Sequence, residues 1–204
     1  LLALAVSAFA IGTTEFISVG LLPLIAEDLH ISVTMSALTV TLYALGVTIG
    51  APVLTSLTSS VPRKTLLLWI MIVFIAGNSL AAVSSGITLL LIARIISAFS
   101  HGVFMSIGST IAADLVPDDR RASAISIMFS GLTVATVTGV PLGTYVGQQW
   151  GWRVAFMAIV VVGVVALIAN LILLPSTLRK GNKTPLGEQV KLVTNGRLLL
   201  AFII

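Results

Sequence analysis

Apolar residues occur along this chain in long uninterrupted runs, and polar residues gather in the short gaps between them. About 20 consecutive apolar residues are enough to cross a bilayer as an α-helix. The runs therefore predict six complete membrane-spanning helices, over residues 2–25, 36–57, 66–84, 88–112, 123–147 and 154–174. A seventh apolar run begins near Leu198. We expect an all-α, polytopic membrane protein in which residues 1–174 form one six-helix bundle.

The composition supports this assignment. The chain is 57% hydrophobic and only 9% charged, with a mean hydropathy of +1.14, whereas a soluble domain carries about 25% charged residues. The net charge of +4 does not indicate a nucleic-acid partner, because the basic residues lie in the gaps between apolar runs. The chain has no cysteine, which excludes disulfides and thiolate chemistry. We expect no metal and no organic cofactor.

The loop cations predict the orientation in the membrane. Nine of the eleven Lys and Arg residues fall in gaps on one side, Arg153 is alone on the other side, and Arg94 lies inside a predicted helix. Because cytoplasmic loops are enriched in Lys and Arg, the amino terminus is predicted to be cytoplasmic. Residues 175–197 would then be a cytoplasmic loop and 198–204 the start of a seventh helix. The chain begins without Met and stops inside an apolar run, so we expect it to be part of a longer protein.

A short order of residues recurs in the two halves of this region. Ser7-Ala8-Phe9 followed by Gly12 recurs as Ser97-Ala98-Phe99 followed by Gly102, and Gly50-Ala51-Pro52 recurs as Gly139-Val140-Pro141. The offset corresponds to three predicted helices, and three is odd, so the second copy must enter the membrane from the opposite side. Inverted three-helix repeats are an architecture of secondary transporters. Chance repetition of small and apolar residues is the alternative interpretation.

Glu15 is the residue most indicative of function. It stands inside the first apolar run, roughly 18 Å from the helix end near Glu27 at 1.5 Å per residue. A charged side chain at that depth costs about 2.5–3.5 kcal/mol, so intramembrane carboxylates usually carry protons or meet a substrate. The structural alternative is a neutral glutamic acid that joins two helices by a hydrogen bond.

Arg94 and His101 are weaker candidates in the fourth predicted helix. With Ser97, their spacing of three and four places them on one helix face. Arg94 could instead extend its charged head towards the membrane surface. For His101, a hydrogen-bonded position between helices is the favoured interpretation.

Small residues in the fifth predicted helix favour close helix packing. Gly139, Gly143 and Gly147 recur at spacing four, with Gly131 earlier, and such stripes let membrane helices approach closely. Pro141 removes one helix hydrogen bond and can bend the backbone. Static packing is one interpretation; the functional one is that these residues let two bundles move against each other.

These residues also resemble a family. The segment Gly12-Thr13-Thr14-Glu15-Phe16, followed by Gly20-Leu21-Leu22-Pro23-Leu24-Ile25-Ala26-Glu27-Asp28-Leu29, resembles the first helix of bacterial major facilitator superfamily proteins of the drug/proton antiporter group. The nearest branch contains sugar-efflux, arabinose-efflux-like and chloramphenicol-efflux proteins. Arg94 with Gly102 is similar to a helix-four motif whose Arg is associated with proton transfer. The residues Gly131, Gly139, Pro141, Gly143 and Gly147 are similar to the helix-five antiporter motif.

The resemblance is incomplete in one loop. The family usually has Gly-x-x-x-Asp-Arg-x-Gly-Arg-Arg between its second and third helices, whereas this chain keeps the cations Arg63 and Lys64 and lacks the acid. If that acid normally locks one face of the transporter, this chain must use other contacts there. The resemblance implies the amino-terminal half of a twelve-helix fold.

Together these observations favour a proton-coupled exporter of small organic molecules, with Glu15 at its proton or substrate site and Arg94 and His101 beside it. Its partners would be the substrate, protons, the lipid of a bacterial inner membrane and a second six-helix half. The proton gradient would supply the energy. The alternatives are a sugar or nucleoside symporter or uniporter of the same fold, a passive channel subunit, and a membrane enzyme. The enzyme is disfavoured because the sequence lacks Gly-x-Ser-x-Gly, His-Glu-x-x-His and paired intramembrane aspartates.

Overall fold

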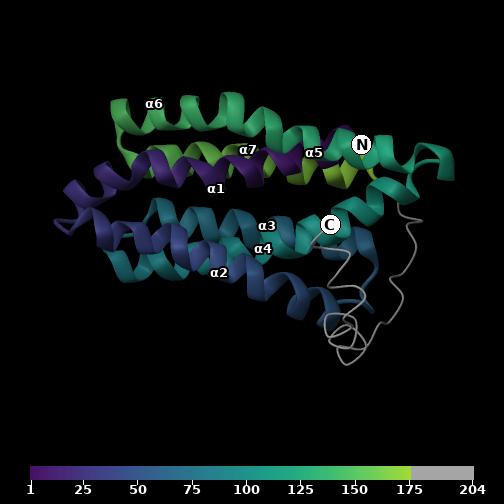
Figure 1. The fold of residues 1–204 in the computed structure, drawn as a ribbon, viewed down its shortest axis with the longest axis horizontal. Coiled ribbons are helices and arrows are strands. Elements are labelled where there is room, and N and C mark those ends of the chain that lie inside the picture. The colour runs from purple at the N-terminus through teal and green to yellow at the C-terminus, as the bar shows by residue number, and fades with distance from the viewer. Residues whose placement is uncertain (176–204) are drawn as a thin grey trace, which may run out of the picture.

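In a computed structural model of the chain, which describes residues 1–175, long helices lie side by side along one direction (Figure 1). They are α1 (Leu2–Asp28), α2 (Val33–Leu57), α3 (Arg63–Ala82), α4 (Ile87–Asp114), the short turn η1 (Asp118–Arg120), α5 (Arg121–Val134), the π-helical turn η2 (Ala135–Gly139), α6 (Val140–Trp150) and α7 (Trp152–Leu173).

The six predicted spans are confirmed. Within residues 1–175, six helical segments are long and apolar enough to cross a membrane, and α5, η2 and α6 together form the fifth of them. Their ends differ from the predicted ends by a few residues, since helices continue past the hydrocarbon into the interface. The predicted loop and seventh helix, residues 175–197 and 198–204, lie outside the described residues apart from Pro175.

The helices pack as two interlocked sets that mirror each other. The first span packs against the fifth and sixth, and the fourth span packs in the same way against the second and third. The third and sixth spans meet each other. Exchanging spans one to three with spans four to six therefore leaves these main contacts unchanged, which is the arrangement that inverted three-helix repeats require; the additional contact between the fifth and sixth spans has no counterpart of similar size between the second and third.

Contacts between individual residues are related by the same exchange of the two repeats. Gly50 in α2 packs against Phe99 in α4, and Gly139 at the end of η2 packs against Phe9 and Thr13 in α1. Phe9 and Phe99, like Gly50 and Gly139, are the matched positions of the repeat in the sequence. The recurrence is therefore structural.

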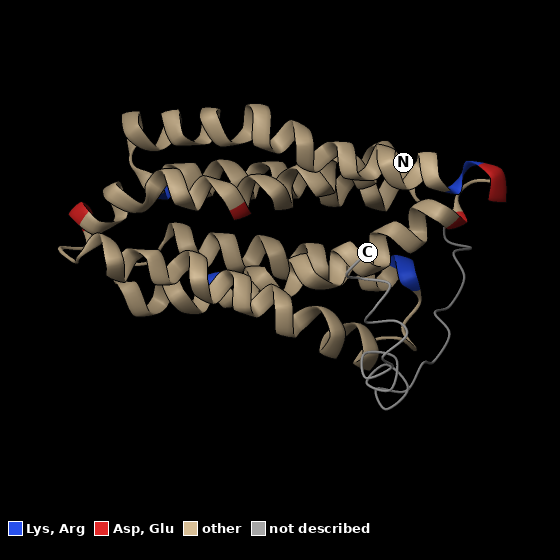
Figure 2. Ribbon diagram, viewed as in Figure 1, with Lys and Arg blue, Asp and Glu red and all other residues tan. Residues whose placement is uncertain are grey.

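Charged residues are concentrated at the two ends of the bundle, with few between them (Figure 2). We call the end that carries Arg63, Lys64, Arg120 and Arg121 the basic end. Many large apolar side chains along the helices are exposed, including Ile72, Val161 and Ile172, as expected for surfaces that meet lipid rather than water.

The fifth span contains a wide turn. Ala135–Gly139 form a π-helical turn two residues before Pro141, which has no N–H to donate to the preceding turn. The hydroxyl groups of Thr136 and Thr138 donate to the carbonyls of Leu132 and Val134 at 2.9 and 2.8 Å. These bonds satisfy the two hydroxyl groups within the helix, which lipid could not do.

Candidate functional site: a polar cluster at mid-membrane depth

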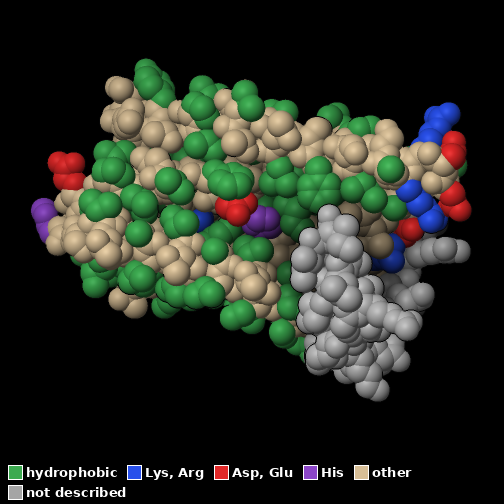
Figure 3. Space-filling model, in the orientation of Figure 1, with side chains coloured by type: hydrophobic (Ala, Val, Ile, Leu, Met, Phe, Trp, Pro, Cys, Tyr) green, Lys and Arg blue, Asp and Glu red, His purple; other side chains and the backbone are tan. Residues whose placement is uncertain are grey.

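Glu15 lies halfway along α1 and faces a cavity of about 550 Å³. Its side chain is 32% exposed. The cavity is lined by residues of α1, α2, α4, α5 and η2, most of them apolar: Glu15, Phe16, Val47, His101, Met105, Leu132, Thr133, Thr136 and Val137. In Figure 3 an acidic and a histidine side chain meet at mid-length on this face, among hydrophobic side chains. A carboxyl group is thus available to a molecule or an ion in the cavity.

His101 connects Glu15 to α2. Its Nδ1 lies 3.8 Å from Glu15 Oε2, which is ion-pair distance, and 3.2 Å from the hydroxyl of Tyr43, which is hydrogen-bond distance. The ring of His101 is buried, with 6% exposure, and Tyr43 is 2% exposed. The favoured sequence interpretation, a histidine hydrogen-bonded between helices, therefore describes its position, and the same histidine also contacts Glu15.

Arg94 lies beneath this pair and is buried, with 1% exposure. Its Nη1 donates to the carbonyl of Thr14 at 3.0 Å and its Nε to the carbonyl of Thr39 at 3.4 Å. Its guanidinium stacks on the ring of Tyr43, 4.0 Å from the ring centre. The idea that Arg94 extends towards the membrane surface is therefore wrong, because two backbone carbonyls and a ring hold the head inside the bundle.

Among the described residues, no carboxylate contacts the guanidinium of Arg94. Carbonyl groups and aromatic rings surround it, with Phe156 of α7 5.8 Å away, and its Nη2 has no hydrogen-bond partner. A buried cation of this kind adds a fixed positive potential to its surroundings, since the low dielectric screens it weakly. Glu15 is the acidic side chain on which that potential acts.

Three residues of this cluster were predicted from the sequence, and two others were not. It predicted Glu15, Arg94 and His101, and the structure places them in one cluster. It missed Tyr43, and it missed Asn78 of α3, which accepts a hydrogen bond from the hydroxyl of Thr14. Asn78 is completely buried inside an apolar run, and that isolated amide was the signal in the sequence that could have revealed it.

The predicted glycines lie elsewhere, against α1. A side chain at Gly131 would meet the backbone of Ala5, and one at Gly143 or Gly147 would meet Ile17 or Leu21. They bring the fifth span close to α1 within this bundle, which is the static packing interpretation; movement of two bundles against each other stays a prediction. Their small size is needed there because neighbouring backbones approach closely.

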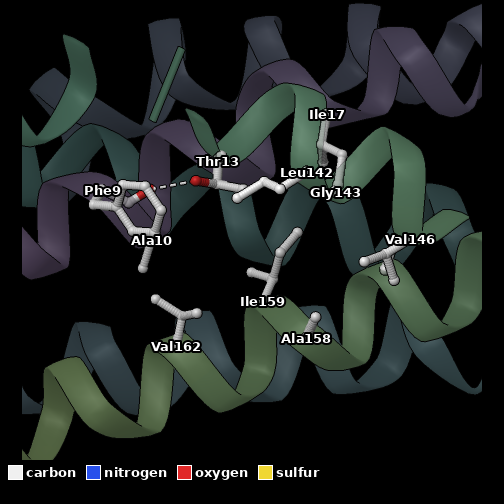
Figure 4. Close-up of a pocket in the computed structure, with 12 residues that line it drawn as sticks. Phe9, Ala10, Thr13, Ile17, Leu142, Gly143, Val146, Ala158, Ile159 and Val162 are labelled. Carbon is white, nitrogen blue, oxygen red and sulfur yellow. Dashed lines mark hydrogen bonds between the residues drawn. The ribbon is translucent and has the colours of Figure 1, made fainter. Parts of the chain in front are cut away.

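Beside these glycines is a second cavity, of about 180 Å³, between α1, α6 and α7 (Figure 4). Its walls are almost entirely apolar, and the hydroxyl of Thr13 donates to its own helix, to the carbonyl of Phe9 at 2.8 Å. Thr13 and Ile17 are each two residues from Glu15, so they lie on nearly the opposite face of α1 at about 100° per residue. This cavity is thus separate from the polar cluster.

Arg63 and Lys64 hold the basic end together. Arg63 forms an ion pair with Asp114 at the end of α4, and both side chains are largely buried. Lys64 donates to the carbonyls of Leu171 and Leu174 near the end of α7. Although the acid of the usual loop motif is missing, the surviving cations tie α3 to the ends of two other spans.

At the opposite end, Trp150 and Trp152 differ. Trp150 is 63% exposed, as expected for an interfacial residue, but Trp152 is 2% exposed and its Nε1 donates to Asp28 at 3.2 Å. A tryptophan in the gap before a membrane span is expected to lie at the lipid interface, and for Trp152 that expectation is wrong. Asp28 also pairs with Arg153 at 2.6 Å, so the end of α1 is fastened to the start of α7.

Comparison with known proteins agrees with the fold. The profile of the Major Facilitator Superfamily matches residues 4–204. The chain is 76% identical over 204 residues to the uncharacterised MFS-type transporter YtbD of Bacillus subtilis, covering 100% of this chain and 52% of that protein. It is 42% identical over 175 residues to the inner membrane transport protein YdhP of Escherichia coli K12, covering 86% of this chain and 45% of that protein.

Among solved structures, peptide transporter POT in complex with sulfate matches with a TM-score of 0.79 at 15% identity, over 99% of this chain and 44% of that one. This likeness concerns the fold. The chain spans about half the length of the curated relatives it matches. Its helices, inverted repeats and sequence all place it in one family of transporters rather than enzymes: the chain belongs to the Major Facilitator Superfamily.

Proposed function

We propose that this chain is the amino-terminal half of a proton-coupled transporter that exports small organic molecules by alternating access. The observation that carries the proposal is the position of Glu15. It lies at mid-membrane depth, is partly exposed to a cavity, and among the described residues its only ion-pair contact is His101. A carboxyl group with a structural role only would be expected to be enclosed by hydrogen-bond partners.

The cavity suits a small organic molecule better than an ion. Apart from Glu15, His101, Thr133 and Thr136, its walls are apolar. Ligand sites in proteins are typically apolar with a few polar groups that fix orientation. A second six-helix half would close the open side of this cavity, and the molecule would then be exposed to one side of the membrane at a time.

The electrostatics support a proton site. Arg94 lies below the cluster, and within residues 1–175 it has no contacting counter-ion. When Glu15 is ionised, it offsets that buried positive potential; when it is protonated, the potential acts on whatever else enters the cavity. Loading a proton on Glu15 and loading a substrate near it are therefore coupled through one field. The proposed location is the bacterial inner membrane, in line with the name of the Escherichia coli relative, an inner membrane transport protein.

The direct test is proton movement during transport. The full-length protein is reconstituted in vesicles that contain a trapped pH dye, and small organic molecules, including arabinose and chloramphenicol, are added outside. Antiport predicts that an acidic interior drives accumulation of a substrate and that protons leave as it enters. Protons that enter with the substrate would instead show a symporter, and accumulation without proton movement would exclude coupling.

We also propose that the basic end faces the cytoplasm, as the loop cations predict. Single cysteines at Ser60, near the basic end, and at Gln148, near the opposite end, are both exposed positions. In intact cells an impermeant thiol reagent should label the cysteine at Gln148 and not the one at Ser60. Labelling of Ser60 alone would reverse the proposed orientation.

A further inference from the structure

His101 has two competing neighbours at one nitrogen. Its Nδ1 lies 3.2 Å from the Tyr43 hydroxyl and 3.8 Å from Glu15 Oε2. In a neutral imidazole one ring nitrogen donates and the other accepts. Nδ1 therefore cannot accept a hydrogen bond from Tyr43 and donate one to Glu15 at the same time.

The distances favour Tyr43. A separation of 3.2 Å allows a hydrogen bond, whereas 3.8 Å is too long for one. We propose that Tyr43 is a positioning residue of the proton site: its hydroxyl donates to His101 Nδ1, holds the proton of the imidazole on Nε2, and so keeps His101 from binding the Glu15 carboxylate. This role deepens the proposed function and rests on it, because it concerns which group shares a proton with Glu15.

Packing around Tyr43 explains how it can hold this position. The residue is 2% exposed, and its ring is pinned by the guanidinium of Arg94 at 4.0 Å. Arg94 is itself fixed by the carbonyls of Thr14 and Thr39. A ring held in this way leaves its hydroxyl group little freedom of orientation. The hydrogen-bond partner of one histidine ring nitrogen determines whether the other nitrogen carries the proton.

The charged and titratable groups that act on Tyr43 are few. The helix α2 packs against α4 and α1. From α4 they are Arg94 and His101, and from α1 the group is Glu15. Tyr43 thus contacts both the buried cation and the histidine that lines the cavity.

The test removes one oxygen atom. Tyr43→Phe keeps the ring under Arg94 and deletes the hydroxyl, and the exposed Tyr145 supplies a matched control, Tyr145→Phe. The full-length protein is labelled with ¹⁵N-histidine in lipid nanodiscs, and the His101 signals are assigned by their loss in His101→Gln. The nitrogen shifts report which ring nitrogen carries the proton, without any substrate.

We expect the proton on Nε2 in the wild type and in Tyr145→Phe, and a shift of population towards Nδ1 in Tyr43→Phe. Adding Glu15→Gln should then move the titration midpoint of His101 by about one pH unit in the Tyr43→Phe protein, the size of effect of one hydrogen bond to a charged group. The same change in the wild type should move it much less.

The proposal is overturned if the wild-type proton is on Nδ1, if Tyr43→Phe leaves the tautomer unchanged, or if Tyr145→Phe has the same effect. Normal elution of Tyr43→Phe on size-exclusion chromatography shows that it folds. The tautomer of His101 is measured without transport. If transport proved independent of protons, the proposed function would be wrong, and the role of Tyr43 in fixing the tautomer could still be tested.

Discussion

Replacing Glu15 by Gln should abolish concentrative, pH-driven transport while leaving a folded protein that can still equilibrate substrate. Glutamine keeps the size and hydrogen-bonding capacity of the side chain but cannot take up or release a proton. The partly exposed position of Glu15 means that little packing is lost. The measurement is substrate accumulation in vesicles with and without a pH gradient, for the wild type and Glu15→Gln.

A second carboxylate provides the control for this change. Glu27 lies on the same helix near the opposite end of the bundle and is exposed, so Glu27→Gln should retain full gradient-driven accumulation. If Glu15→Gln also retains it, Glu15 is structural, and the proton carrier lies at His101 or in a part of the protein outside the described residues.

The second large effect, a loss of thermal stability, is expected when one methyl group is added at Gly131. At Gly131 a Cβ atom would collide with the backbone carbonyl of Ala5 and lie 2.9 Å from the Cβ of Ala8. Backbone atoms cannot turn aside as a side chain can, so α1 and α5 would have to separate. Overpacking of this kind costs about 1–3 kcal/mol. Gly131→Ala should therefore lower the temperature at which the purified full-length protein loses its monodisperse peak on size-exclusion chromatography.

Gly86 offers the matched comparison. A Cβ there meets nothing within 4 Å, so Gly86→Ala should cost only the small preference for Gly over Ala at the N-cap of α4 and lower thermal stability much less. Equal stability of Gly131→Ala and Gly86→Ala would contradict the close contact between α1 and α5, and with it the packing role assigned to the glycines of the fifth span.

The fold could be predicted well from the sequence because few backbone conformations are stable inside a bilayer. A long apolar run in lipid must satisfy its backbone internally, and a helix does so. The repeat of Phe9 and Phe99 with their glycine partners then predicted the inverted arrangement. The depth of Glu15 followed from counting residues along a helix.

The contacts inside the site were harder to predict. Helices that are apolar on nearly every side carry little periodic signal about which face turns inward. The pairing of Tyr43 with His101, or of Thr14 with Asn78, depends on that rotation and joins residues far apart in the chain. For the same reason the glycine stripe could be recognised as an interface before its partner, α1, was known.

Because of the wide turn at Ala135–Gly139, the fifth span can lose one residue and keep its glycines facing α1. Gly131 and Gly139 are eight residues apart, which in a regular helix would rotate them about 80° away from each other, yet both face α1. A π turn holds one residue more than an α turn and absorbs that rotation. Deleting one residue here would leave a spacing of seven, about 20° short of two full turns, and would again direct both glycines to α1. In most membrane helices the same deletion turns everything beyond it by about 100°. Loss of one residue in this short segment should therefore leave the interface between the fifth span and α1 in place.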